Sequence, residues 1–300
     1  MQQSTPLISV VMTSYNHQNY ISEAIESVLN QTFKDFELII VDDASTDNSV
    51  ELINHYQKKD PRIKTIFHSS NKGIPETTND GFEIARGQFA AYTNSDDVWI
   101  PEKLEKQIQI LEKNPDFVVW SDAMIIDANG RETGQLFSQM QDIVGRKKSG
   151  YIFPQLVKGN FICAISVIFA TRIARQIKFD TNLSYANDYK FMIDVSKNHH
   201  FYFISEPLVK YRIHGQNSIL KNREGWERDN FIIAQYVIRK YGNEIPNDFK
   251  AILYRRIGKY LFKRKHYAVS RKCFWASIIT NPLKTSSYRN YIFSLVKKSL

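Results

Sequence analysis

Short apolar runs alternate with amphipathic stretches through the first hundred residues of the chain. Four β-branched or aromatic runs have the length of buried strands, at residues 7–12, 36–41, 63–67 and 89–93. Each run is followed by apolar residues at helical spacing. Strand–helix units in series predict a mostly parallel sheet flanked by helices, because parallel neighbours need crossover connections. Such a sheet binds ligands at the carboxyl ends of its strands.

The pattern changes after residue 117. Shorter apolar runs predict strands that extend the sheet, at residues 117–120, 124–126, 161–169, 201–204 and 208–213. The polar stretch at residues 135–150 predicts a loop or lid, and residues 188–196 have the spacing of a helix. From residue 227 onward the apolar positions are helical, so we expect a separate α-helical appendage there.

Composition narrows the class of protein. With 300 residues and 43% hydrophobic side chains, the chain can fill a real core, which excludes a disordered tail or a disulfide-stapled miniprotein. Cys163 and Cys273 are too few for a disulfide framework and lack metal-ligand spacing, so we expect a cytoplasmic protein without zinc. We expect neither a signal peptide nor a membrane-spanning helix, because no apolar run approaches about 20 residues.

Charge is distributed unevenly along the chain, whose formal net charge is +9. Thirteen Lys and Arg residues lie from Lys250 onward, where there is no Asp or Glu, and residues 1–249 are mildly acidic by contrast. These cations alternate with aromatic side chains such as Tyr260 and Trp275. The segment fits an anionic partner, which could be a lipid surface, a polyphosphate or nucleic acid; the alternative is a solvated helical face. No nucleic-acid-binding motif accompanies it, so nucleic acid is not expected.

Paired carboxylates follow two of the predicted strands. Asp42 and Asp43 come after the second strand, and Asp96 and Asp97 come after the fourth. An isolated Asp-Asp pair is usually a turn or a helix cap. Two pairs at the carboxyl ends of strands in one sheet should face one crevice, where they favour a hard divalent cation together with substrate phosphates.

Several segments resemble family 2 glycosyltransferases, which are inverting nucleotide-diphospho-sugar transferases of the GT-A fold. The segments are residues 9–16 (SVVMTSYN), 24–33 (AIESVLNQTF), 36–47 (FELIIVDDASTD), 71–73 and 94–97. Residues 179–193 are similar to the acceptor-side segment of the family, except that Asn187 stands where the family usually has Glu. The resemblance runs from residue 7 to about residue 218.

The resemblance implies a division of the chain. Residues 1–220 would form the GT-A domain, with a nucleotide-sugar-binding half at 1–100 and an acceptor-binding half at 101–220. Residues 221–300 would form the basic helical region outside the catalytic resemblance.

The resemblance also implies a donor site for a nucleotide diphosphate sugar, most commonly a UDP-sugar in this family, with Mn²⁺ or Mg²⁺. Asp97 with Asp96 would form the metal and ribose site, and His214 in Tyr-Arg-Ile-His would complete the metal shell or touch the diphosphate. The remaining donor-site residues would contact the base or the phosphates; they are Thr13, Tyr15, Asp43 and Lys72. Asp42 would cap the following helix, and Arg212 could pair with phosphate.

Inversion in a single in-line displacement requires one general base on the acceptor side. By resemblance, Asp188 has this role, and the alternative is a carboxylate that only stabilises the start of its helix. Trp120 and Asp122 are candidates for the acceptor or sugar pocket, with burial of Trp120 an equal alternative.

The sequence thus predicts an inverting, metal-dependent glycosyltransferase of the hexosyltransferase type. It would transfer a sugar to a hydroxyl of a glycan or lipid-linked acceptor in surface polysaccharide synthesis, with peripheral attachment at the inner face of the membrane. The alternative is a catalytically inactive protein of the same fold that binds a nucleotide sugar or has a regulatory role. A phosphoacceptor receiver domain is disfavoured, because the first strand ends in Thr13-Ser14-Tyr15-Asn16 rather than in acids.

Overall fold

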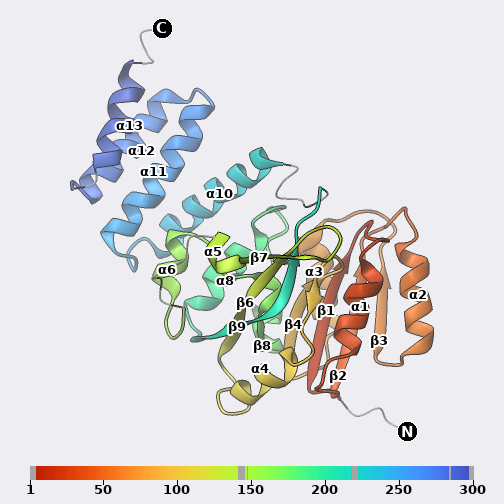
Figure 1. The fold of residues 1–300 in the computed structure, drawn as a ribbon. Helices are drawn as coiled ribbons and strands as arrows, with labels where there is room; N and C mark the ends of the chain where they lie inside the picture. Colours follow the sequence, from red (N-terminus) through yellow and green to blue (C-terminus); the bar gives the residue numbers. More distant parts are fainter. Residues whose placement is uncertain are drawn as a thin grey trace. The chain divides into compact units, whose positions relative to one another are not determined.

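The computed structural model describes most of the chain, which divides into two compact units (Figure 1). The described residues are 5–140, 146, 148–215, 217, 222–283 and 285–296. The first unit comprises Met1–Ile152 with Phe161–Asn217, and the second comprises Phe153–Asn160 with Ser218–Leu300. Residues 153–160 therefore belong with the C-terminal part of the chain rather than with their neighbours in sequence.

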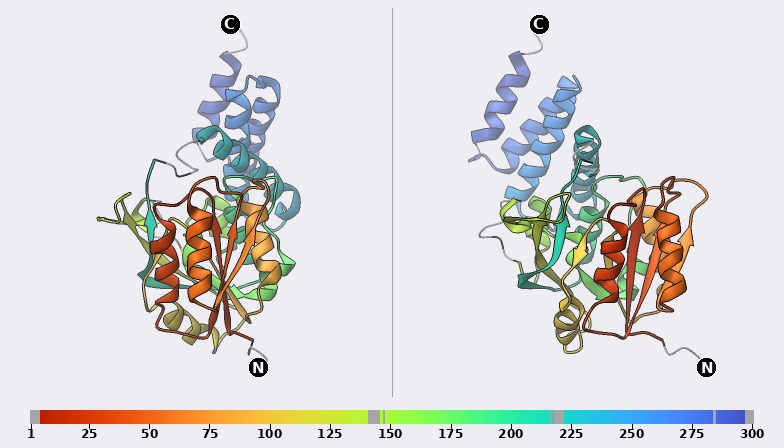
Figure 2. Two further views of the ribbon diagram at one scale, coloured as in Figure 1. Left: turned by 90° about the vertical axis from the view of Figure 1, so that its right-hand side faces the viewer. Right: turned by 45° about the vertical axis from the view of Figure 1, so that its right-hand side comes forward.

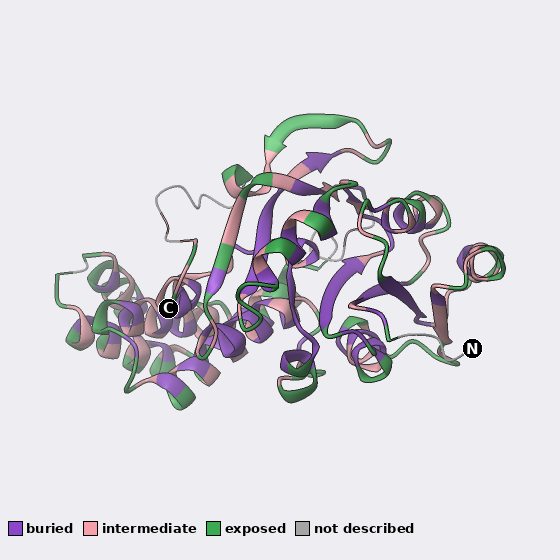
Figure 3. Cartoon of the chain, turned by 90° about the horizontal axis from the view of Figure 1, so that it is seen from below, coloured by how far each residue is buried: buried purple, intermediate pink, exposed green. Residues whose placement is uncertain are grey.

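The first unit is built on a sheet whose four leading strands are parallel. They are β1 (Ile8–Ser14), β2 (Phe36–Asp42), β3 (Ile63–Phe67) and β4 (Phe89–Asn94), in the spatial order β3-β2-β1-β4. Ile8 pairs with both Phe36 and Phe89, so the carboxyl ends of β1, β2 and β4 reach the same edge. The predicted α/β sheet is confirmed, and β1, β2 and most of β4 are buried (Figure 3).

Helices cover both faces of these strands (Figure 2). Helices α1 (Ile21–Leu29) and α2 (Ser49–Lys59) lie on one face, and α3 (Ile74–Ile84) lies on the other. Helix α3 can approach β1 closely because Gly81 has no side chain. A Cβ at this position would lie 2.4 Å from Cγ1 of Val11.

Strands of varied length extend the sheet beyond β4. They are β8 (Ile168–Ala170), β6 (Val118–Ile126), β9 (Phe201–Arg212) and β5 (Val98–Trp99), with β7 (Glu132–Leu136) paired to β6. The accompanying helices are α4 (Lys103–Leu111), α5 (Phe137–Met140), α7 (Thr171–Gln176) and α8 (Asn187–Ser196). Strand β8 is antiparallel to β4, and β9 is parallel to β6, so the extension is mixed.

The predicted breaks in these strands are wrong. Residues 118–120 and 124–126 belong to one strand, β6, and residues 201–204 and 208–212 belong to β9. The β6–β9 register shifts around Asp122, so the polar interruption in the apolar pattern is an irregularity inside a continuous strand.

Two further predictions are corrected in the same region. Only the end of the predicted strand at 161–169 forms β8, because Ala164–Ser166 makes a 3₁₀ turn (η1) in which the Ser166 hydroxyl donates to the Cys163 carbonyl at 2.7 Å. In the predicted loop at 135–150, residues 135–136 belong to β7 and residues 137–140 form α5. Residues 141–145 and 147 of this stretch lie outside the described residues.

The second unit is helical. Its elements are α6 (Phe153–Lys158), α10 (Arg223–Tyr241), α11 (Asn247–Lys263), α12 (Tyr267–Thr280) and α13 (Thr285–Val296). Helix α12 packs closely on α11, because Gly258 leaves space for the ring of Phe274. The hydroxyl of Ser277 donates to the Ala251 carbonyl at 2.7 Å. The predicted C-terminal helices are present, and none of the helices described here is long and apolar enough to cross a bilayer.

Candidate active site

The second acidic pair lies at the carboxyl end of β4, in a loop that is bonded to neighbouring strands. The Ser95 amide donates to the Thr13 carbonyl at the end of β1, at 3.0 Å. The Arg212 side chain donates through Nε to the Asp96 carbonyl at 2.8 Å. Both Asp96 and Asp97 are buried. The end of β9 therefore fixes this loop from one side and β1 fixes it from the other.

The carboxylate of Asp97 is held entirely by hydrogen bonds inside the protein. Its Oδ1 accepts the backbone N–H of Arg212 at 2.9 Å, and its Oδ2 accepts the side-chain amide of Asn94 at 3.0 Å. Burial, together with the adjacent charge of Asp96, raises the pKa of Asp97 well above its ordinary value, against these hydrogen bonds. Asp97 is thus positioned by the ends of β4 and β9.

Asp96 lies in a cluster with two imidazoles. Its Oδ2 is 3.0 Å from Nε2 of His214 and 3.9 Å from Nε2 of His17. One ligand atom from each of these three residues lies within 4.8 Å of the others. The Nδ1 atom of His17 is hydrogen-bonded to the Ser95 hydroxyl at 2.8 Å, which directs the opposite ring nitrogen toward Asp96.

This cluster fits a divalent cation. The Oδ1 atom of Asp96 is buried and has no hydrogen-bond partner among the described residues, as expected for an oxygen reserved for a ligand. A set of two imidazoles and a carboxylate suits Mn²⁺ or Fe²⁺ better than Mg²⁺, which prefers oxygen alone. His214 was expected from the sequence, whereas His17 was not, and Asp96 rather than Asp97 offers the free oxygen.

A second network joins β1 to β4. The hydroxyl of Thr13 contacts the Tyr92 hydroxyl at 3.4 Å and the Asn94 side chain at 3.3 Å. Tyr92 also donates to the side-chain oxygen of Asn94, whose amide in turn holds Asp97. Thr13, expected to contact the base through its main chain, therefore also supports the acidic loop through its side chain.

Asp188 influences two tyrosines that the acidic loop also influences. It is in the first turn of α8, partly exposed. Burial raises the pKa of Tyr92, and the charges of Asp188, Asp97 and Asp96 raise it further. The same three carboxylates act on the buried phenol of Tyr211. Asp188 and the acidic loop therefore act electrostatically on the same two phenols, and such effects weaken with distance.

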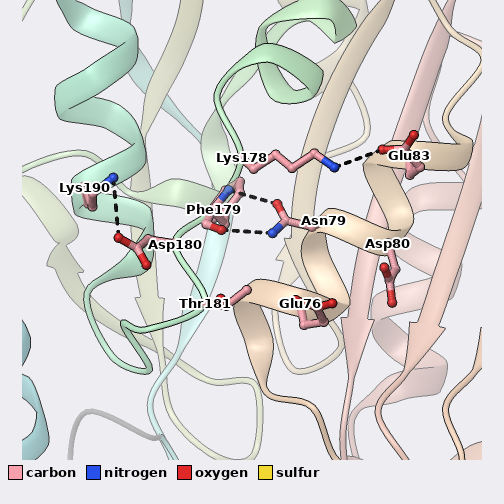
Figure 4. A pocket seen from close by; sticks show the side chains of 9 residues that line it. All are labelled: Glu76, Asn79, Asp80, Glu83, Lys178, Phe179, Asp180, Thr181 and Lys190. Carbon is pink, nitrogen blue, oxygen red and sulfur yellow. Dashed lines mark hydrogen bonds and ion pairs between the residues drawn. The ribbon is translucent and has the colours of Figure 1, made fainter.

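The segment before α8 is anchored on α3. The side-chain amide of Asn79 donates to the Phe179 carbonyl at 2.9 Å and accepts its N–H at 2.9 Å. The ring of Phe179 stacks on Phe191 of α8 with centroids 4.3 Å apart. A polar pocket of about 490 Å³ lies between α3 and this segment, lined by Asn79, Asp80, Asp180 and Lys190 among others (Figure 4). These contacts hold in place the segment that leads into α8 and Asp188.

Asp43 forms the centre of a separate group at the carboxyl end of β2. Its Oδ1 accepts from Nδ1 of His68 and from the backbone N–H of Lys72, both at 2.8 Å, and its Oδ2 accepts the Gly73 N–H at 2.8 Å. Gly73 can present this N–H because it adopts a φ of 88°. Burial raises the pKa of Asp43, but these hydrogen bonds outweigh burial, and the net shift is downward.

The neighbours of Asp43 have different roles. The carboxylate of Asp42 accepts from Ser14 at 2.9 Å and from the Ser45 amide at 2.8 Å, so it holds the loop after β2. The Lys72 ammonium donates to Asp80 at 3.2 Å rather than standing free. The Tyr15 ring follows β1 and is exposed, as a surface for stacking would be.

Three other candidates from the sequence are engaged internally. Trp120 is buried, with its ring 4.5 Å from that of Phe203. Asp122 accepts the backbone N–H groups of Ala123 and Ser138 at 2.9 and 3.0 Å. The Arg212 guanidinium, buried beside Asp96, also pairs with Glu23. These contacts account for all three side chains as structural groups.

Comparison with known proteins identifies the family. Residues 9–172 match the model of the family described as Glycosyl transferase family 2. An uncharacterized glycosyltransferase of Methanocaldococcus jannaschii is 36% identical over 219 residues, which cover 72% of this chain and 73% of that protein. The chain therefore belongs to glycosyltransferase family 2 and is a transferase, as the resemblance implied.

A further relative and two solved structures extend the comparison. TuaG of Bacillus subtilis, whose name refers to teichuronic acid biosynthesis, is 41% identical over 106 residues, or 35% of this chain and 42% of TuaG. Residues 1–349 of Staphylococcus aureus TarS with UDP give a TM-score of 0.67 at 18% identity, covering 96% of this chain and 88% of that one. The mannosyltransferase PcManGT of Pyrobaculum calidifontis with GDP-Man and Mn²⁺ gives 0.63 at 14% identity, covering 97% and 86%. These structures share the fold.

Proposed function

We propose that this glycosyltransferase transfers a hexose from a nucleoside diphosphate sugar, with inversion, to a hydroxyl of a glycan or glycolipid acceptor. The observation that carries the proposal is the cluster of His17, Asp96 and His214 at the carboxyl ends of β1, β4 and β9. In this proposal residues 1–220 form the catalytic domain, apart from residues 153–160, which belong to the second unit, and residues 221–300 form an accessory helical region.

The donor is bound across the ends of β1, β2 and β4. Asp43 accepts a hydrogen bond from the base, and the Thr13 main chain and the Tyr15 ring hold its face. Lys72 contributes its backbone N–H to Asp43, and its ammonium pairs with Asp80 beside the base. Asp96 holds the ribose side of the metal site, and Asp97 supports the loop that carries Asp96. TarS with UDP supports a uridine donor, and PcManGT with GDP-Man shows that the fold also serves guanosine donors.

The cation of this site is Mn²⁺, held by His17, Asp96 and His214. The mixed nitrogen and oxygen donor set supports Mn²⁺ over Mg²⁺, and PcManGT was solved with Mn²⁺. When bound, the cation supplies Lewis-acid stabilisation of the diphosphate leaving group. Asp97 acts through Asn94 and the Arg212 backbone, by fixing the shape of the loop that carries Asp96.

Asp188 is the general base. Its carboxylate takes the proton of the acceptor hydroxyl while that oxygen bonds to the anomeric carbon from the face opposite the diphosphate. The bond between the anomeric carbon and the diphosphate oxygen breaks, and its electron pair leaves with the nucleoside diphosphate. Asn187, in place of the family's Glu, leaves Asp188 without an acidic neighbour on its N-terminal side.

Two wider assignments follow from the same proposal. The product is a surface polysaccharide or a related glycolipid, which the likeness to TuaG supports. The protein attaches peripherally to the inner face of the membrane through its second unit. Large apolar side chains are exposed on α12, α13 and the turn between them, namely Trp275, Ile279, Leu283, Ile292 and Phe293. They lie in the segment that has thirteen cations and no acid, which suits an anionic bilayer.

The test is release of nucleoside diphosphate from a panel of nucleotide sugars with Mn²⁺ and a glycan acceptor. We expect Asp188→Asn to lower kcat by at least about 10²-fold, as general-base catalysis contributes, while nucleotide affinity stays within about threefold. Asp96→Asn should lose both turnover and affinity. Asp116→Asn, which changes an exposed carboxylate, is the control.

Electron paramagnetic resonance of bound Mn²⁺ gives a readout that is independent of turnover. His17→Gln and Asp96→Asn should weaken Mn²⁺ binding at least about tenfold, and Asp188→Asn should not. Tight nucleotide binding by the wild type without turnover on any donor would instead support the inactive alternative. Near-native turnover in Asp188→Asn would show that another group is the base.

A further inference from the structure

The number of acceptor positions left on Asp43 limits which base it can recognise. A carboxylate oxygen has two lone pairs, so the side chain can accept about four hydrogen bonds. Both positions on Oδ1 are occupied, by Nδ1 of His68 and by the Lys72 N–H, each at 2.8 Å. One position on Oδ2 takes the Gly73 N–H at 2.8 Å. One acceptor position on Oδ2 therefore takes no donor from the described residues.

His68 is fixed so that it can contact Asp43 in only one way. The imidazole is 3% exposed, and Nε2, the nitrogen that does not face Asp43, lies 3.0 Å from Oδ2 of Asp80. Asp80 is held in turn by the Lys72 ammonium at 3.2 Å. With a carboxylate on each side, the ring cannot rotate away from Asp43 without losing both hydrogen bonds. His68 thus occupies one Oδ1 position permanently.

We propose that His68 is a specificity-determining residue, which restricts Asp43 to a single hydrogen bond with the donor's base and so favours uridine over guanosine. Uracil presents one N–H on its pairing edge, at N3. Guanine presents two neighbouring donors, N1–H and the N2 amino group. These two groups can each donate a hydrogen bond to one carboxylate oxygen, provided that both oxygens have an unoccupied acceptor position. Cytosine presents a lone pair at N3, which an ionised carboxylate repels. The proposal rests on the donor site proposed above, in which Asp43 contacts the base.

Replacement of His68 should affect the affinities for UDP and GDP differently. His68→Leu removes a donor from Oδ1, which leaves the Asp43 carboxylate less constrained and opens a second acceptor position. We expect UDP affinity to fall about three- to tenfold, GDP affinity to hold or rise, and the UDP/GDP affinity ratio to fall at least about threefold. His68→Asn keeps an amide donor at the position of Nδ1, so it should retain a ratio within about twofold of the wild type.

The measurement is isothermal titration of the full chain with UDP and GDP, each with Mn²⁺. His55→Leu, a change of an exposed histidine on α2, is the matched control, and circular dichroism reports whether each variant is folded. Asp80→Asn is the second variant. It keeps His68 in place through one hydrogen bond and should change the ratio less than His68→Leu does.

Each outcome bears on the inference. A wild type that binds UDP at least tenfold more tightly than GDP, with a reduced ratio in His68→Leu and a retained ratio in His68→Asn, supports it. An unchanged ratio in folded His68→Leu, equal losses for both nucleotides, or a wild-type preference for GDP overturns it while leaving the proposed transferase intact. Absence of nucleotide binding by the wild type would overturn the proposed function as well.

Discussion

Lys103 is a lysine whose side chain is buried away from water. The residue is fully buried at the start of α4, with its ammonium 2.8 Å from the side-chain oxygen of Gln107 and 3.9 Å from the centroid of the Trp99 ring. Burial lowers the pKa of Lys103 to about 7, because transfer from water disfavours the charged form. The folded protein therefore releases this proton at a pH at which the unfolded chain still holds it.

This difference gives stability a defined pH dependence. Between pH 7 and about 10.5 the unfolded state holds one more proton at Lys103 than the folded state, so the free energy of unfolding rises with pH. Relative to Lys103→Met, the wild type should gain up to about 1.4 kcal/mol per pH unit in this window and nothing below pH 7. Urea unfolding of both proteins at pH 6, 7.5 and 9 measures the difference. Lys113→Met, at an exposed position, is the control, and its difference from the wild type in the free energy of unfolding should not depend on pH. A pH-independent difference for Lys103→Met as well would show that Lys103 stays charged in the folded protein.

At the residue scale, the sequence predicts the acids of the proposed site but not all of their partners. Asp43, Asp96 and Asp188 stand out because each carries a recognisable local motif. His17 and His68 carry no motif, and their roles arise only when the sheet brings distant segments together. A histidine three residues after the first strand is nevertheless a signal, because that strand ends beside the acidic loop.

At the scale of elements, local periodicity predicts structure well where strand and helix partners follow each other along the chain. The four leading strand–helix units have this property and were predicted correctly. Strands β6 and β9 pair with each other across about eighty residues of chain, and a polar residue such as Asp122 looks like a break until its bulge is seen. The periodicity of apolar residues does not show which distant segments of the chain pair with each other.

One helix–helix contact gives a direct test of packing. A Cβ at position 258 of α11 would lie 2.6 Å from the Phe274 ring of α12. Alanine is the better helix former by about 1 kcal/mol, yet we expect Gly258→Ala to destabilise the second unit by roughly 1–3 kcal/mol, because overpacking outweighs propensity. Thermal unfolding measures the loss. Adding Phe274→Leu should recover part of it, whereas additive effects would show that the two helices are not in close contact.

At the scale of the whole molecule, the basic second unit should give the protein a preference for negatively charged bilayers. We expect the full chain to sediment with vesicles that contain anionic lipid and to stay in solution with neutral ones, since each cation near such a surface contributes about 1 kcal/mol. Raising the salt concentration should weaken this binding.

Matched tryptophan variants locate the contact. Trp275→Ala, combined with Ile279→Ala, should reduce sedimentation at least threefold, while Trp226→Ala on α10 should not, although both tryptophans are exposed. Equal binding to neutral and anionic vesicles would contradict the proposal. A concentration-dependent dimer without vesicles, lost in the same double variant, would show that the apolar face pairs with a second copy instead.

The place of α6 in the chain has a practical consequence for anyone who wishes to isolate the proposed catalytic domain. Phe153 packs on Tyr241 with centroids 5.1 Å apart, and the Lys158 carbonyl accepts from Arg256 at 2.9 Å, so this short helix is covered by α10 and α11. Truncation of the chain after residue 217 would remove α10 and α11 and expose the apolar side chains of Phe153, Leu156 and Val157. A protein with this exposed apolar patch would be prone to aggregate. Separating the halves cleanly calls for excising residues 153–160 and rejoining their flanks, as well as shortening the tail.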